Sequence, residues 1–222
     1  MLAKYHCYGK LIRMSKNPVP EGQEQMWLAQ THWILPHDAA DVNFNDPRLN
    51  HVTAYTVDIE NVLTDGVAGG DPTIRPKGLL MLNRIAQSGR DILLLTGCKD
   101  EEFGWAVKNQ AQQDLGIAYI PTMYRGLRSD GTRWPGKHDP AMFGMAGAAL
   151  KRRHKEIGHI DDQLKSHLGA WRTNYGLHIW PTPFGEHEHP GVAMFRPLEM
   201  SIIRGLMAAH PRSRGPSFIE RS

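Results

Sequence analysis

Several residues of this sequence carry side chains that could catalyse a reaction, and they fall into acidic, hydroxyl and basic groups. Two acidic pairs, one threonine followed by glycine, and one lysine stand at separate points of the chain: Asp58 with Glu60, Thr96 with Gly97, Lys137, and Asp161 with Asp162. Carboxylates that are brought together repel one another and raise each other's pKa unless a cation lies among them. Hard oxygen ligands with an open coordination sphere suit Mg²⁺, which often shares a phosphate with the protein.

The lysine and the hydroxyl group indicate what such a metal centre would act on. Opposite a magnesium ion, Lys137 and Thr96 could neutralise the charge of a transferring phosphoryl group. An aspartate such as Asp58 can act as the nucleophile and form an aspartyl-phosphate. These residue types together predict a magnesium-dependent enzyme that transfers a phosphoryl group through aspartate.

The chain around these residues alternates between strand and helix patterns. Apolar and β-branched runs predict strands at residues 52–57, 91–95, 117–121, 157–160 and 177–180. Pro or acidic residues near the first turn, and Gly after the last, are typical of helix ends. They predict helices at residues 76–88, 101–115 and 163–175, and one from Pro140 into the basic run 151–155. Short connections between such elements predict an α/β fold with a doubly wound parallel sheet, whose ligands bind at the carboxyl ends of the strands.

Four motifs at these strand ends resemble those of the haloacid dehalogenase (HAD) superfamily over about residues 52–183. They are Asp58-Ile-Glu60-Asn-Val-Leu-Thr-Asp-Gly, Leu-Leu-Leu-Thr96-Gly97, Lys137-His-Asp-Pro-Ala-Met-Phe and Gly-His-Ile-Asp161-Asp162. The resemblance implies a HAD-like Rossmannoid fold and a phosphatase, a hydrolase of phosphomonoesters that uses Mg²⁺ as its cofactor.

The resemblance also implies a role for each motif residue. Asp58 would be the nucleophile and a Mg²⁺ ligand, and Glu60 the general acid and base, with its backbone carbonyl also meeting the metal. Thr96 would bind the phosphate, and Lys137 would pair with Asp58 and the phosphoryl oxygens. Asp161 and Asp162 would hold the ion directly or through water. Glu60 departs from the Asp that is usual in the superfamily, but the enolase-phosphatase branch carries a similar Asp-Ile-Glu, so Glu is compatible with activity.

The spacing of the motifs leaves no room for a large cap domain, so we expect an open site that accepts large substrates. Two narrower resemblances disagree about the substrate. Residues 160–180 and the loop 128–133 are similar to the 3′-phosphatase domain of bacteriophage polynucleotide kinase, which favours a nucleic-acid 3′-phosphate or a nucleotide. Residues 58–66 look more like the 3-deoxy-octulosonate 8-phosphate phosphatases, which favours a small sugar phosphate. The predicted substrate contacts are Gly97, Arg125, Arg128 and Arg133.

Two further alternatives stay open at the level of sequence. Glu60 and the unexplained first fifty residues are also compatible with a catalytically silent HAD-fold module for binding or assembly. The basic run 151–155 could grip a phosphate backbone, or it could be a solvated helix end.

Length, charge and cysteine content indicate how the chain is organised and where it works. The chain has 222 residues, a formal net charge of +3 and two cysteines. We expect an amino-terminal appendage (1–50), a HAD-like catalytic domain (51–196), and a carboxy-terminal helix with a basic tail (197–222). The lack of a long apolar stretch and the low cysteine content predict a soluble, cytoplasmic protein with no membrane partner. A homo-oligomer is compatible with the sequence.

Overall fold

The computed structural model describes residues 32–181, except for 35, 37, 66–69, 99, 125–134 and 138. Six parallel strands form a single sheet in the order β1-β6-β5-β2-β3-β4. Their bounds are β1 His32–Ile34, β2 Ala54–Asp58, β3 Asp91–Leu95, β4 Thr122–Met123, β5 Ile157–Ile160 and β6 Leu177–Ile179. The predicted α/β fold with a parallel sheet is thereby confirmed.

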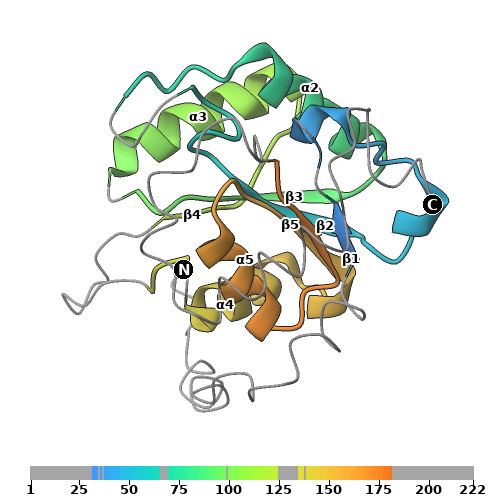
Figure 1. Ribbon diagram of the computed structural model, residues 1–222. Helices are drawn as coiled ribbons and strands as arrows, with labels where there is room; N and C mark the ends of the chain where they lie inside the picture. Colours follow the sequence, from blue (N-terminus) through green and yellow to red (C-terminus); the bar gives the residue numbers. More distant parts are fainter. Residues whose placement is uncertain are drawn as a thin grey trace, which may run out of the picture.

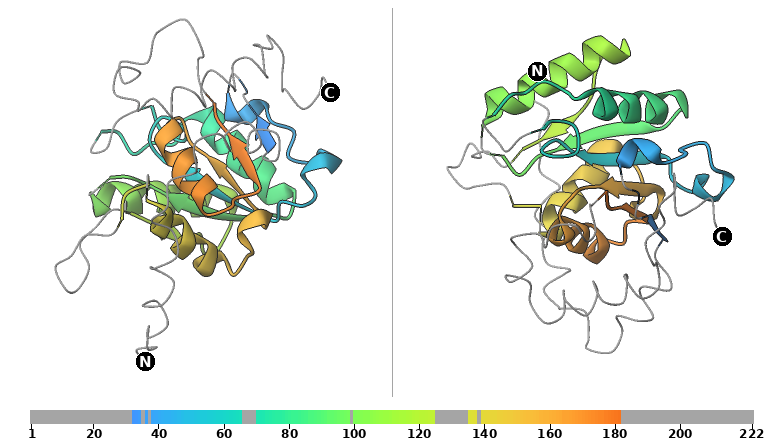
Figure 2. Two further views of the ribbon diagram at one scale, coloured as in Figure 1. Left: turned by 60° about the horizontal axis from the view of Figure 1, so that its bottom comes forward. Right: turned by 45° about the horizontal axis from the view of Figure 1, so that its top comes forward.

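Among the described residues, four α-helices cover the two faces of this sheet. They are α2 (Pro76–Gln87), α3 (Glu101–Leu115), α4 (Pro140–Leu150) and α5 (Leu164–Arg172). Figure 1 shows α2 and α3 on one face of the sheet and α4 and α5 on the other, and Figure 2 shows the same layers from two further directions. The central strands are buried on both sides, which explains the continuous apolar run of β3 from Ile92 to Leu95. None of the helices in the described part of the chain is long and apolar enough to cross a membrane.

The helices begin and end where local chemistry dictates. The Asp100 carboxylate accepts hydrogen bonds from the backbone of Glu102 and Phe103 at the start of α3, and Gly116 ends that helix with a φ of 64°. Asp139 caps α4 in the same manner. Helix α4 ends at Leu150, because Lys151 adopts a left-handed conformation with a φ of 55°. The prediction that this helix runs into the basic residues 151–155 is therefore wrong.

The strand predicted at residues 117–121 lies instead at β4, further along the chain. The backbone of this stretch is bonded to a side chain of α3, since Gln112 donates to the Ala118 carbonyl and accepts from the Ile120 amide. Pro121 has no N–H to give to the neighbouring strand β3, so regular pairing begins only at Thr122. Helix α5 is also shorter than predicted, because Asn174 turns the chain with a φ of 70°.

The described residues between 32 and 50 contribute to the same core as the rest of the sheet. Strand β1 pairs with β6 at the edge, and Val42, Phe44 and Leu49 are buried in the main hydrophobic cluster. The Arg90 guanidinium donates to the backbone carbonyls of Phe44, Leu49 and Val52. The segment interpreted as an appendage therefore contains an element of the sheet. Residues 1–31 and the carboxy-terminal segment 197–222 lie outside the described residues.

Candidate active site

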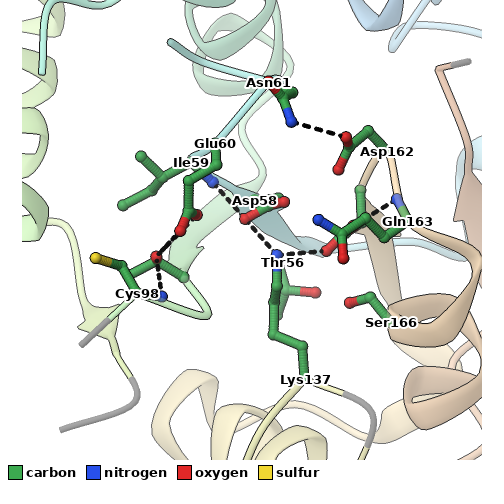
Figure 3. Close-up of polar contacts among 12 residues, drawn as sticks. Thr56, Asp58, Ile59, Glu60, Asn61, Cys98, Lys137, Asp162, Gln163 and Ser166 are labelled. Atoms are coloured by element: carbon green, nitrogen blue, oxygen red, sulfur yellow. Dashed lines mark hydrogen bonds and ion pairs between the residues drawn. The ribbon is translucent and has the colours of Figure 1, made fainter. Parts of the chain in front are cut away.

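Parallel pairing brings the motif residues to one edge of the sheet. Asp58 is the last residue of β2, and Asp161 and Asp162 directly follow β5, the neighbour of β2 on one side. Thr96 directly follows β3, the neighbour on the other side, where Leu95 pairs with Asp58. Asp58 therefore lies between the two groups, as the order of strands requires. Figure 3 shows the side chains converging on it.

Lys137 links the acidic residues of β2 and β5. Its Nζ lies 2.6 Å from Asp58 Oδ1 and 3.0 Å from Asp161 Oδ2, and all three side chains are buried. Burial lowers the pKa of Lys137, but the charges of Asp161, Asp58 and Glu60 outweigh it and leave the pKa above its ordinary value. The lysine is therefore charged at neutral pH.

Helix α5 packs closely against the backbone of Lys137 because it carries Gly169 at the point of contact. A Cβ on Gly169 would lie 2.5 Å from the Lys137 carbonyl oxygen and 2.6 Å from the Phe143 ring. Such distances are shorter than any side chain tolerates, so only glycine fits without a shift. Sequence reasoning passed over Gly169, although a glycine inside a helix is a signal of close packing.

Three carboxylates gather beside the lysine. One oxygen each from Asp58, Asp161 and Asp162 lies within 4.8 Å of the other two. Burial, and then the charge of Asp161, raise the pKa of Asp58 well above its usual range. The same two causes raise the pKa of Asp162 to about 6. Burial also acts to raise the pKa of Asp161, but Lys137 and His159 outweigh it and hold that pKa below its ordinary value.

The acidic cluster fits a hard divalent cation. Asp58 Oδ2 and Asp162 Oδ1 are buried and have no hydrogen-bond partner in the part of the chain that the structure describes. Buried carboxylate oxygens are costly to leave unpaired. A cation among the three carboxylates would give Asp162 Oδ1 a partner and relieve the repulsion that raises the pKa values of Asp58 and Asp162.

Glu60 lies on the other side of Asp58, toward β3. The Thr96 hydroxyl donates to its carboxylate and lies 2.8 Å from each oxygen, and the Cys98 amide in turn donates to that hydroxyl at 2.9 Å. The Glu60 side chain is therefore not one of the three carboxylates of the acidic cluster. Gly97 lies beside Lys137, because a Cβ at that position would be 3.4 Å from the lysine Cε.

Polar residues behind the acids were missed from the sequence. The His159 ring contacts the Thr56 and Ser166 hydroxyls at 2.9 and 2.8 Å, and its Nε2 lies 3.6 Å from Asp161 Oδ2. His159 lies on β5 and precedes Asp161 by two positions, a spacing that puts both side chains on the same face of an extended chain, so the signal was present. Burial lowers the pKa of His159, which favours the neutral ring.

A second buried histidine supports Asp161 through its backbone. The His167 ring lies 2.9 Å from the Asp161 carbonyl and 3.2 Å from the ring of His178. Burial lowers the pKa of His167 to about 3. Its place on α5, eleven residues before its partner on β6, gave no local signal in the sequence.

The other predicted contacts divide into two groups. Arg125, Arg128 and Arg133 lie outside the described residues. The basic run 151–155 lies at the amino-terminal ends of the strands, opposite the acidic cluster, because Arg152 pairs with Asp91 at the start of β3 at 2.7 Å. The two ends of a five-residue strand are about 13 Å apart. The basic run is therefore remote from the acidic cluster.

Comparisons with known proteins found similar folds among solved structures. No model of a protein family matches the chain. The comparison with curated proteins gave no match either. An uncharacterized protein from Listeria monocytogenes serotype 4b has a TM-score of 0.47 and 16% identity, over 63% of this chain and 85% of its own. A proposed HAD-like phosphatase from Mesorhizobium loti has a TM-score of 0.46 and 16% identity, over 74% and 90% of the two chains.

A third similar structure is the 3-deoxy-D-manno-octulosonate 8-phosphate phosphatase of Moraxella catarrhalis, solved in complex with magnesium, phosphate and KDO. Its TM-score is 0.41 and its identity 16%, over 72% of this chain and 89% of its own. These identities are too low to transfer a substrate, so the function of this chain is argued from its own residues.

Proposed function

We propose that this chain is a magnesium-dependent phosphomonoester hydrolase of the HAD type that acts through Asp58. The observation that carries the proposal is the position of Asp58. One of its oxygens is held by the Ile59 amide at 2.8 Å and by Lys137 at 2.6 Å, while the other has no hydrogen-bond partner among the described residues. A buried, oriented carboxylate with one oxygen available is suited to nucleophilic attack on phosphorus.

Lys137 would favour the reactive, ionised form of this nucleophile. Attack requires an ionised carboxylate, yet burial and the charge of Asp161 raise the pKa of Asp58. The nearby ammonium group acts in the opposite direction and favours the ionised form. The same group would lie beside the phosphoryl oxygens and offset their charge. Asp58, Asp161 and Asp162 would hold Mg²⁺, which would supply further positive charge to the phosphoryl group.

Glu60 would move the proton in both steps. As an Asp58 oxygen bonds to phosphorus, the bond from phosphorus to the ester oxygen breaks, and protonated Glu60 donates its proton to that leaving oxygen. Ionised Glu60 then takes a proton from water, whose oxygen attacks the phosphorus while the bond to Asp58 breaks. The products are an alcohol and inorganic phosphate. Thr96 orients the Glu60 carboxylate for this exchange through its hydroxyl.

The preferred substrate class is a phosphomonoester on a nucleic-acid 3′ end or a nucleotide. The short connections between the motif residues support this choice, because the stretches of sequence between the motifs are too short for a cap domain. The described part of the loop after β2 is a small flap, in which Thr64 bridges both Glu60 and Ile74. Arg125, Arg128 and Arg133, which precede Lys137 in the sequence, are the proposed contacts to the substrate. A small sugar phosphate is the competing substrate.

Phosphate release from a panel of esters tests the proposal. The panel contains an aryl phosphate, mononucleotides, sugar phosphates and a 3′-phosphorylated oligonucleotide, each with and without Mg²⁺. Asp58→Asn is the control, since it keeps the shape of the side chain and removes the nucleophile. We expect release that requires both Mg²⁺ and Asp58, with the oligonucleotide or a nucleotide preferred. No release above the control from any ester, in a chain that binds Mg²⁺, would favour a silent binding module instead.

A further inference from the structure

Asn61, the residue after Glu60, contacts one carboxylate of the acidic cluster through its side chain. Its backbone is left-handed, with a φ of 60°, a conformation that asparagine adopts more readily than other residues with a side chain. Its Nδ2 donates to Asp162 Oδ2 at 3.1 Å (Figure 3). This hydrogen bond joins the loop that follows Asp58 at the end of β2 to the loop after β5, which carries Asp161 and Asp162.

Asp162 is held from two directions. The Trp180 indole donates to its backbone carbonyl at 2.9 Å, which fixes the main chain from the side of β6. The Asn61 amide holds one oxygen of the side chain, while the other oxygen, Oδ1, is buried and has no hydrogen-bond partner among the described residues. A carboxylate held at one oxygen has its second oxygen fixed in direction, because the group is planar.

We propose that Asn61 is a positioning residue that orients the Asp162 carboxylate toward the metal site which that residue shares with Asp58 and Asp161. This inference rests on the magnesium site of the proposed function. The ligand of the site is a hard divalent cation, and Asn61 acts on it only through Asp162.

The chemistry of an asparagine suits this role better than the alternatives. Its NH₂ group donates and carries no charge, so it fixes an acceptor oxygen without adding to the charge of three carboxylates. Aspartate at this position would face Asp162 with a like charge. Glycine would accept the left-handed backbone but would leave Asp162 Oδ2 without its donor.

A direct measurement of magnesium binding tests the role of Asn61. The variant Asn61→Gly keeps the backbone conformation and removes only the amide. Asn174→Gly is a matched control, because Asn174 is also left-handed, with a φ of 70°, and precedes β6 at the opposite edge of the sheet. Loss of a residue that orients a metal ligand lowers metal affinity by about 10–100-fold. We expect isothermal titration calorimetry to show about a tenfold weaker Mg²⁺ affinity for Asn61→Gly and no change for Asn174→Gly.

A double-mutant cycle separates positioning from a general loss of structure. If Asn61 acts through Asp162, adding Asn61→Gly to Asp162→Asn should weaken Mg²⁺ binding no further than Asp162→Asn does alone. In Asn61→Gly, saturating Mg²⁺ should restore kcat toward that of the unmodified chain, because only the affinity for the metal is lowered. Equal Mg²⁺ affinity in Asn61→Gly and Asn174→Gly would overturn the role of Asn61 and leave the metal site standing. Failure of the unmodified chain to bind Mg²⁺ would overturn both.

Discussion

The two sides of Asp58 compensate their charges by different means. Toward β5, a buried lysine lies within 3.0 Å of both Asp58 and Asp161. Toward β3, the Glu60 carboxylate meets the neutral hydroxyl of Thr96. A buried ion pair holds its partners in one charge state, because neutralising either leaves the other uncompensated. A carboxylate bonded to a hydroxyl can gain or lose a proton while it keeps its partner. The first side is therefore built to fix charge, and the second to exchange a proton.

Removal of the lysine should show the largest effect on the charge-fixing side. Lys137→Met leaves Asp58 and Asp161 buried without their shared cation, and loss of one partner of a buried pair costs about 3–5 kcal/mol. Urea denaturation in the presence of a chelator would measure this loss. Lys108→Met is the control, since Lys108 contacts only the exposed rings of Trp105 and Tyr119 among the interactions described, and we expect it to cost less than about 1 kcal/mol. Equal stability losses in the two variants would contradict the comparison.

A substitution of Glu60, on the proton-exchanging side, should change the activity much more than the stability. Glu60→Gln keeps an oxygen that can accept from Thr96 but cannot move a proton, so we expect kcat to fall by about 10²–10⁴-fold and the unfolding free energy to change by much less than in Lys137→Met. Steady-state phosphate release and urea denaturation of the same samples would check both expectations. An unchanged kcat would show that Glu60 transfers no proton.

The position of the lysine can be disturbed without touching its charge. Gly169→Ala forces a methyl group against the Lys137 carbonyl oxygen and the Phe143 ring, and such overpacking costs about 1–3 kcal/mol. Gly144→Ala is the matched control, because a Cβ there meets nothing within 4 Å and α4 should gain about 0.5–1 kcal/mol from the better helix former. Differential scanning calorimetry should show opposite shifts in Tm. Two shifts of the same sign would argue against the close approach of α5 to Lys137.

The buried histidines behind Asp161 should make the free energy of unfolding fall in acid. His167 has a pKa of about 3 in the folded protein and an ordinary value near 6.5 when unfolded. Between these values the unfolded chain binds more protons, so stability is lost as the pH falls below about 6.5. His167 alone should cost about 1 kcal/mol between pH 7 and pH 5.5. Unfolding curves at both pH values, with His167→Gln as the comparison, would measure it. A pH dependence that is the same in the variant would contradict the assignment.

Sequence reasoning located the carboxylates because parallel strands end at a common edge. Asp58, Thr96 and Asp161 each lie at the end of a strand that the doubly wound sheet buries on both faces. The strand order then brings them together without further information. Lys137 follows no strand, and the sequence marks it only as a basic residue shortly before the helix that begins at Pro140.

The remaining features depend on contacts between distant segments. Asn61 and Asp162 are separated by 101 positions, and neither position alone signals a hydrogen bond between the two loops. The strand near residue 120 was misplaced because its apolar residues suggested pairing, whereas Pro121 and the side chain of Gln112 control the backbone there. Strand β1 is only three residues long, so it becomes recognisable only beside β6.

The three carbonyl groups held by Arg90 bear on how the chain can be divided for experiments. Two of them, from Phe44 and Leu49, belong to the segment before residue 50, and the third belongs to Val52. A chain that began at residue 51 would lack β1, so the backbone of β6 would become an exposed edge that can pair with other molecules. Arg90 would also lose two of its acceptors beside the start of β3. A soluble fragment of this protein should therefore begin before residue 32.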